Sequence, residues 1–124
     1  MNGIDIFADT NILIYAMEGH RTIEGILHCS PGISVISEIE LLGKKNISRQ
    51  EENLLRELLN GFEIVKFSDR IKEITISLKQ KYTIKTPDAI IAATAKAFNL
   101  PLVTADKDFK RIKDIEVVLL DLNT

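Results

Sequence analysis

The stretch IFADTNILIYA, from Ile6 to Ala16, decides the fold, because an apolar run is interrupted by one carboxylate, Asp9, and then resumes. The residues before it, Ile4–Ala8, have the length and character of a short buried strand, and a helix is expected over about residues 11–17. An ionised carboxylate in an apolar setting is costly unless a cation or hydrogen bonds compensate it. Asp9 therefore either caps the helix that follows or holds a ligand.

Strands and helices alternate along the rest of the chain. Pro31-Gly32 reads as a turn, Ser37 as a helix N-cap with Glu40 three residues on, and Thr86 as the N-cap of an Ala-rich helix. Further strands are predicted at 33–37, 62–67, 100–106 and 115–122, and helices at 22–29, 37–43, 48–61, 68–82 and 86–99. This alternation predicts a single α/β domain over residues 1–124, a three-layer α/β/α sandwich whose mainly parallel sheet has about five strands.

Composition narrows the class of protein. The one cysteine, Cys29, cannot form an internal disulfide; it suggests a reducing, cytoplasmic setting and is expected to be a buried small apolar group. Apolar runs stay well short of the ~18 residues that span a membrane, and the N-terminus lacks a signal-peptide pattern. We therefore expect a cytoplasmic protein with no membrane partner.

Charge is distributed unevenly along the chain. The net charge is −2, but residues 66–113 carry eleven Lys and Arg against five Asp and Glu. A basic C-terminal half is compatible with a polyanionic partner such as a nucleic acid. An ordinary solvated surface of mixed charge explains the same numbers equally well.

Acidic residues recur at positions that share one edge of the predicted sheet. Asp9 follows the first strand, Glu40 lies in the first turn of the helix after the second, and Asp106 follows the fourth. Asp88, in the first turn of its helix, reaches that edge only if the preceding loop returns to it. Ligands of parallel α/β folds bind at the carboxyl ends of the strands.

Carboxylates that converge on one point repel each other and raise one another's pKa, and a hard divalent cation removes that conflict. No His or Cys accompanies the acids, which disfavours zinc, and His20 and His28 are expected at the surface. Each acid also has an alternative explanation as a helix cap, a partner of a helix dipole or a turn residue. Together they favour a site for Mg²⁺ or Mn²⁺.

Four motifs carry a resemblance to a known family. They are DTNIL (9–13), SVISEIELLG (34–43), TPDAIIAATA (86–95) and LVTADKDF (102–109). Their order and spacing resemble those of PIN domains, and most closely those of VapC-like toxins of type II toxin–antitoxin pairs. The resemblance implies an endoribonuclease that depends on Mg²⁺ or Mn²⁺ and hydrolyses RNA phosphodiester bonds.

The resemblance also implies roles for individual residues. Asp9, Glu40, Asp88 and Asp106 match the family's catalytic, metal-binding acids, with Asp108 as a further ligand or an outer partner, and Asn11 and Thr104 match supporting polar positions. Glu38 competes with Glu40 but lacks the E-L-L-G context. Lys85, Lys107, Lys110 and Arg111 are candidates for gripping RNA phosphates, or are ordinary solvated side chains.

The family further implies a cognate VapB-like antitoxin and a homodimer formed through helical faces. The stripe from Leu54 to Leu59 and the residues around Ile12 and Ile14 could form that interface, or could equally be core. The alternative to an enzyme is a non-catalytic PIN-like module that binds RNA or protein.

Overall fold

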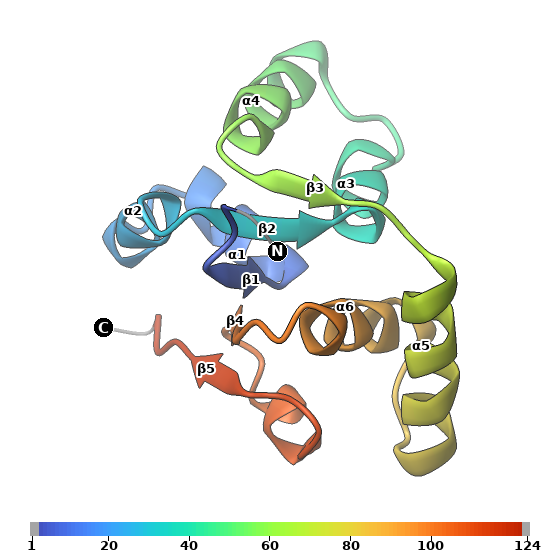
Figure 1. Cartoon of the computed structure of the whole chain (residues 1–124). Coiled ribbons are helices and arrows are strands. Elements are labelled where there is room, and N and C mark those ends of the chain that lie inside the picture. The colour runs from blue at the N-terminus through green and yellow to red at the C-terminus, as the bar shows by residue number, and fades with distance from the viewer. Residues whose placement is uncertain (1–2, 123–124) are drawn as a thin grey trace.

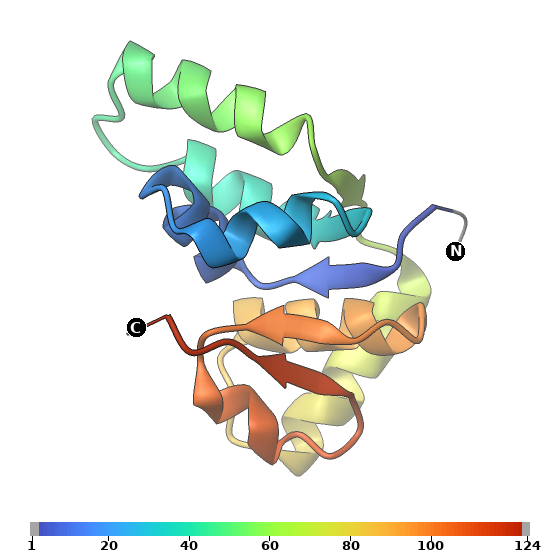
Figure 2. The same ribbon diagram turned by 90° about the vertical axis from the view of Figure 1, so that its left-hand side faces the viewer.

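The protein, seen here in a computed structural model that describes residues 3–122, is built on a five-stranded sheet in the order β3-β2-β1-β4-β5. All four neighbouring pairs run parallel, and in Figure 2 the arrows of β1, β4 and β5 point the same way. The strands are β1 (Ile6–Ala8), β2 (Pro31–Ser34), β3 (Glu63–Val65), β4 (Leu102–Thr104) and β5 (Val117–Leu119). The first strand of the sequence, β1, therefore lies at the centre of the sheet.

Helices cover both faces of this sheet (Figure 1). They are α1 (Thr10–Met17), α2 (Arg21–Leu27), α3 (Val35–Leu42), α4 (Arg49–Leu59), α5 (Asp69–Lys81) and α6 (Thr86–Ala97), followed by a 3₁₀ turn, η1 (Lys107–Arg111). Along β1 and β4, Phe7 and Leu102 pack into a core with α5 and α6, whereas Ala8 and Val103 pack into a second core with α1, α2 and α4. This alternation follows from the two-residue period of a strand, and it confirms the predicted three-layer α/β/α sandwich.

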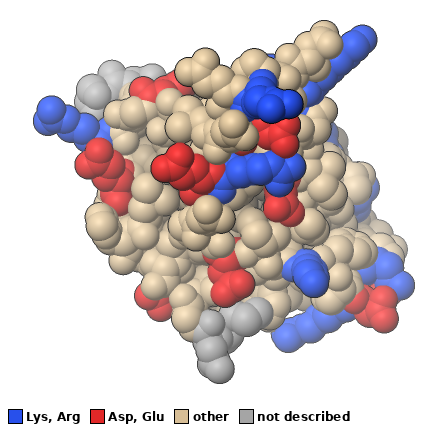
Figure 3. Space-filling model, turned by 90° about the horizontal axis from the view of Figure 1, so that it is seen from above, with Lys and Arg blue, Asp and Glu red and all other residues tan. Residues whose placement is uncertain are grey.

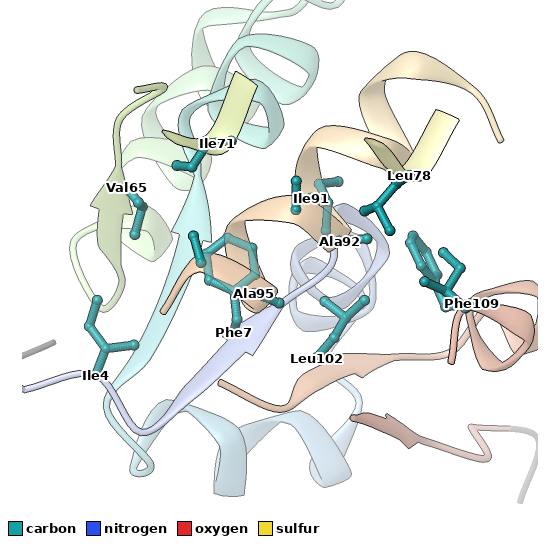
Figure 4. Packing of buried hydrophobic residues seen from close by; sticks show 13 residues of the cluster. Ile4, Phe7, Val65, Ile71, Leu78, Ile91, Ala92, Ala95, Leu102 and Phe109 are labelled. Carbon is teal, nitrogen blue, oxygen red and sulfur yellow. The ribbon is translucent and has the colours of Figure 1, made fainter. Parts of the chain in front are cut away.

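The core on the α5–α6 side depends on small residues (Figure 4). Ala89, Ala92, Ala93 and Ala95 of α6 are all fully buried. Because their side chains are short, α6 lies close to both the sheet and α5. Leu78 of α5 packs in the same core as the last three of these alanines. The Ala-rich composition noted in the sequence thus allows α6 to be buried, which fixes the position of Asp88 in its first turn.

The prediction for the second strand and the helix after it was wrong by about three residues. Pro31 and Gly32 form the start of β2 rather than a turn, paired with Ile6 and Phe7 of β1. A Cβ on Gly32 would come within 3.0 Å of Ile4 Cγ2, so the glycine is needed here for close packing. A proline is tolerated as the first residue of a strand.

Helix α3 consequently begins earlier than predicted. Ser34, and not Ser37, is its N-cap, with the Ser34 hydroxyl accepting from the Ile36 amide at 3.0 Å. Ser37 is instead a residue of the first turn of α3 and is fully buried in the protein. Glu40 therefore lies in the second turn of α3 rather than the first. The N-cap of α6 also differs: it is Lys85, so Thr86 is already helical, although Asp88 stays in the first turn.

Other local predictions fared differently. Ser48 and Ser68, the first residues of the predicted ranges 48–61 and 68–82, are the N-caps of α4 and α5 and accept from the amides of Glu51 and Ile71. Cys29 was expected to be buried and is exposed, because it follows the last turn of α2 on the solvent side. Within residues 3–122, no helix combines the length and apolar character needed to cross a membrane.

The outer surface of the molecule around α4 carries charges of both signs. Figure 3 shows Lys and Arg side chains interspersed with Asp and Glu on this side. Two of the pairs are Arg56 with Glu52 at 2.9 Å and Lys44 with Glu51 at 3.1 Å. The four paired residues lie outside the segment 66–113, so this face does not distinguish the two interpretations of that segment's positive charge.

Candidate active site

Asp9 lies directly after β1, at the centre of the sheet, and its side chain caps α1. Its Oδ1 accepts from the Thr10 amide at 2.8 Å, and its Oδ2 accepts from the Thr104 hydroxyl at 2.7 Å. The residue is 5% exposed. A carboxylate has about four lone-pair positions, so each oxygen can accept one further bond. Asp9 thus caps a helix and can still bind a ligand.

Thr104, the last residue of β4, connects two of the acids. While its hydroxyl donates to Asp9, the same oxygen accepts from the amide of Asp106 at 3.0 Å. Asp106 in turn begins η1, with its Oδ1 accepting from the Asp108 amide at 2.9 Å. The supporting role that the sequence suggested for Thr104 therefore has a specific form: it fixes Asp9 and the turn that carries Asp106.

Glu40 reaches the site from α3 and is held by a residue that the sequence analysis did not single out. The Thr10 hydroxyl donates to Glu40 Oε1 at 3.2 Å and lies 2.6 Å from the hydroxyl of Ser37. Ser37 is fully buried and stands one helical turn before Glu40, on the same side of α3. The adjacency of Thr10 to Asp9 and the three-residue spacing from Ser37 to Glu40 were the available signals.

The four principal acids line one groove. Asp88, at the first turn of α6, meets Asp106 there, so the loop before α6 does return to the carboxyl edge of the sheet. The groove has a volume of about 350 Å³ and is lined by Asp9, Thr10, Asn11, Ile14, Glu40, Leu41, Asp88 and Asp106. We call it the acidic groove. Glu38, the competitor of Glu40, lines a different hollow beside Arg56 and Glu57 of α4.

Two acids of the acidic groove have raised pKa values, so their ionisation is disfavoured. Burial raises the pKa of Asp9 from its ordinary 3.8 to about 6; the hydrogen bonds from Thr104 and Thr10 oppose the rise, and the charges of Asp88 and Asp106 add to it. Burial also raises the pKa of Asp88, with a further contribution from Asp106, while Lys85 opposes it. Burial and the neighbouring acids therefore disfavour the ionised form of both carboxylates.

The donor set fits a hard divalent cation. All candidate ligands are carboxylate oxygens, the chemistry that Mg²⁺ and Mn²⁺ prefer. Within residues 3–122, however, no three Asp, Glu, His or Cys side chains are already arranged to hold one ion. Mg²⁺ commonly binds through one or two carboxylates and several waters. The groove therefore suits an ion that is held by a few acids and water.

The remaining candidates lie around this groove or outside it. Asn11 Oδ1 receives a long, 3.5 Å contact from the Ala105 amide. Next to the acidic groove lies a second hollow of about 430 Å³, which we call the side pocket; Asp108, Lys85 and Arg111 line it, and Asp88 and Asp106 belong to both. Lys107 and Lys110 are exposed on η1 and line neither hollow.

Comparison with known proteins finds a matching family and several relatives of this chain. The sequence model of the PIN domain matches residues 6–115. A curated relative, Ribonuclease VapC of Rickettsia bellii, is 47% identical over 45 residues, which make up 36% of this chain and 34% of the relative. The matched segment therefore spans about a third of that relative's length.

Solved structures match over nearly the whole chain. One is a chain of a toxin–antitoxin complex from Klebsiella pneumoniae, 36% identical with a TM-score of 0.78, covering 92% of this chain and 96% of that one. Another comes from VapBC2 of Rickettsia felis bound to a DNA fragment from its promoter. It is 27% identical with a TM-score of 0.85, covering 95% of this chain and 100% of that one.

Proposed function

Because this chain belongs to the PIN domain family, we propose that it is a divalent-metal-dependent endoribonuclease and the toxin of a VapBC-type toxin–antitoxin pair. Its likeness to a curated VapC ribonuclease and to chains of solved toxin–antitoxin complexes supports this proposal. The substrate would be RNA, and the reaction the hydrolysis of a phosphodiester bond. We also propose that this activity operates in the cytoplasm, where its substrate would be found.

One observation carries the proposal: Asp9 is buried at the centre of the sheet beside two other acids, and its pKa is raised to about 6. Such a carboxylate costs stability, and a cap for α1 does not require it, since Asn or Ser caps a helix as well. A module that only binds RNA or protein gains nothing from that cost. An enzyme that holds a cation does, so the observation favours catalysis over binding alone.

We propose that Asp9, Glu40, Asp88 and Asp106 hold Mg²⁺ or Mn²⁺, with Asp108 as an outer partner. When bound, the ion would supply an activated water for in-line attack and stabilise charge on the leaving oxygen. Thr104 would keep Asp9 and Asp106 in place through its two hydrogen bonds. Thr10 would orient Glu40, and Asn11 would support the turn after β4 through the Ala105 amide.

The proposed contacts with RNA come from four cations in or near the side pocket, and those with protein from exposed apolar side chains. Lys85, Lys107, Lys110 and Arg111 would grip RNA phosphates. An antitoxin or a second copy of the chain would cover the apolar side chains left exposed, such as Ile14 and Leu54, which are 44% and 49% exposed. Ile12, Leu55 and Leu59, also considered for this role, are buried in the core and would not take part.

The test is cleavage of a panel of labelled single-stranded and folded RNAs in Mg²⁺, Mn²⁺ or EDTA. We expect cutting that requires the metal and is lost in Asp9→Asn. The matched control is Asp5→Asn, which removes an exposed acid before β1, at the opposite end of the strand. It should cut as the unmodified chain does.

Two results would contradict the proposal. Cutting that persists in EDTA would exclude a metal-dependent reaction, and cutting by Asp9→Asn at the unmodified rate would exclude Asp9 as a ligand. A protein that cuts no RNA of the panel, yet binds it without metal, would instead favour a non-catalytic binding module. Metal binding itself is measured by titration calorimetry with Mn²⁺ on the same variants.

A further inference from the structure

The side pocket adjoins the acidic groove and differs from it in chemistry. Asp88 and Asp106 belong to both hollows, so the two are adjacent. Ile84 and the largely buried Phe109 and Ile112 give the side pocket an apolar lining. Its volume of about 430 Å³ lies within the range of about 300–1,000 Å³ that is usual for small-molecule sites.

The loop that forms one wall of the side pocket is hydrogen-bonded to both α5 and η1. The loop between α5 and α6 contributes Thr83 and Ile84, whose backbone carbonyls accept from Arg111 and Lys79 respectively. Arg111 belongs to η1, whose first residues follow Asp106. The loop and η1 are thereby tied to each other across the pocket.

The charges of the side pocket suit an anion next to the metal. Lys85 and Arg111 line it together with three acids, but Asp88 and Asp106 would be neutralised by the ion proposed for the acidic groove. Two cations then face one remaining acid, Asp108. Arg111 donates one hydrogen bond to the Thr83 carbonyl. Because a guanidinium has five N–H donors, Arg111 can still bind a phosphate.

We propose that the side pocket is a nucleotide subsite, which takes one nucleotide of the RNA next to the scissile bond. Lys85 and Arg111 contact the phosphate of that nucleotide, and its base lies against the apolar lining of Ile84, Phe109 and Ile112. Lys107 and Lys110, which line neither hollow, contact the strand more weakly. This inference rests on the proposed ribonuclease function, because it presumes an RNA strand that passes through the acidic groove.

The probe is adenosine 5′-monophosphate, which contains no phosphodiester bond and so cannot be cleaved. In ¹⁵N–¹H spectra with Mg²⁺ present, it should shift the amides of residues 83–85 and 106–112. Adenosine and inorganic phosphate, each tested alone, should bind more weakly than the nucleotide. Lys85→Ala and Arg111→Ala should each weaken binding about fivefold or more, in line with the loss of one charged contact.

Two variants serve as controls, since each removes one exposed cation away from both hollows: Lys45→Ala, from the loop between α3 and α4, and Arg70→Ala. Arg70 stands in the first turn of α5, about 18 Å along the helix from the pocket loop. Both controls should bind the nucleotide as the unmodified chain does. With a cleavable RNA, Lys85→Ala should raise KM more than it lowers kcat.

Several outcomes would overturn the inference. They are the absence of shifts at these amides, binding that survives both pocket variants, and binding that the control variants weaken equally. Shifts produced there by a peptide segment of an antitoxin, and not by the nucleotide, would assign the pocket to protein. A chain that cuts RNA without binding the nucleotide here overturns this inference alone, whereas one that binds it and cuts nothing overturns the proposed function alone.

Discussion

Replacing Asp9 by Asn should make the metal-free protein more stable at neutral pH, even though it should abolish cleavage. The reason lies in burial: the carboxylate is 5% exposed, and its charge is disfavoured in the folded chain. Asn keeps the shape of the side chain and can still accept from the Thr10 amide, so α1 remains capped. The substitution removes the buried charge and, with it, the charged acceptor of the Thr104 hydroxyl.

The magnitude follows from the pKa. A rise of the Asp9 pKa from 3.8 in the unfolded chain to about 6 in the folded one corresponds to about 3 kcal/mol of destabilisation at pH 7.5. The Thr104 hydroxyl loses its charged acceptor in the variant, which costs about 1 kcal/mol. We therefore expect the free energy of unfolding to increase by about 2 kcal/mol.

The sign also fixes the pH dependence. Because the folded pKa of this acid is raised, the penalty is absent below the unfolded pKa of 3.8 and complete above about pH 6. The stability advantage of Asp9→Asn should therefore grow between pH 4 and pH 6 and then stay constant. At pH 4 it should vanish or reverse.

The assay is urea unfolding in EDTA at pH 4.0, 5.0, 6.0 and 7.5 (about evenly spaced across the transition), with Asp5→Asn as the control. With an m value of about 2 kcal/mol/M, the unfolding midpoint of Asp9→Asn should rise by about 1 M at pH 7.5. Mg²⁺ should stabilise the unmodified chain and not the variant. A variant that is no more stable at pH 7.5, or whose advantage is the same at pH 4, would refute the reasoning.

Three further substitutions test other parts of the structure. Ser37→Ala removes the buried hydroxyl beside Thr10; it should cost about 1 kcal/mol and weaken Mn²⁺ binding in calorimetry, and Ser37→Thr should restore both. Asp114→Ala takes the acceptor from the Tyr82 hydroxyl and two lysines, so urea unfolding should show a loss of about 1 kcal/mol. The Lys81 ammonium, more than the Tyr82 hydroxyl, lowers the pKa of Asp114, so this loss should be full above its ordinary 3.8 and shrink as the pH falls below it. Leu78→Ala should cost about 2–5 kcal/mol by opening a cavity between α5 and α6; a loss under 1 kcal/mol would mean that the two helices close the gap.

The sequence predicted the positions of those acids of the groove that lie at the ends of strands. Asp9 directly follows β1, Asp106 stands two residues after β4, and parallel neighbours end at the same edge. Asp88 does not follow a strand, so its place depended on a loop whose return no local pattern encodes. The contact of Thr10 with Ser37 joins residues 27 positions apart, and it arises from tertiary packing alone.

The wrong boundary at β2 has a related cause. Pro-Gly is a strong turn signal by itself, but Gly32 is required in the strand because Ile4 and Phe7 pack against its backbone. That requirement comes from residues far away in the sequence. Ser34 and Ser37 are equally good N-caps by residue type, and only the end of the sheet decides between them.

The strand order also determines when the groove can exist during synthesis. Asp9 and Thr104 are hydrogen-bonded across neighbouring strands but lie 95 residues apart, a stretch that a ribosome translates in about 5–20 s at about 5–20 residues per second. A nascent chain therefore exposes its first acid long before β4 is available to complete the site. The acidic groove, and any chemistry it carries out, is therefore absent until almost all of the chain has been translated.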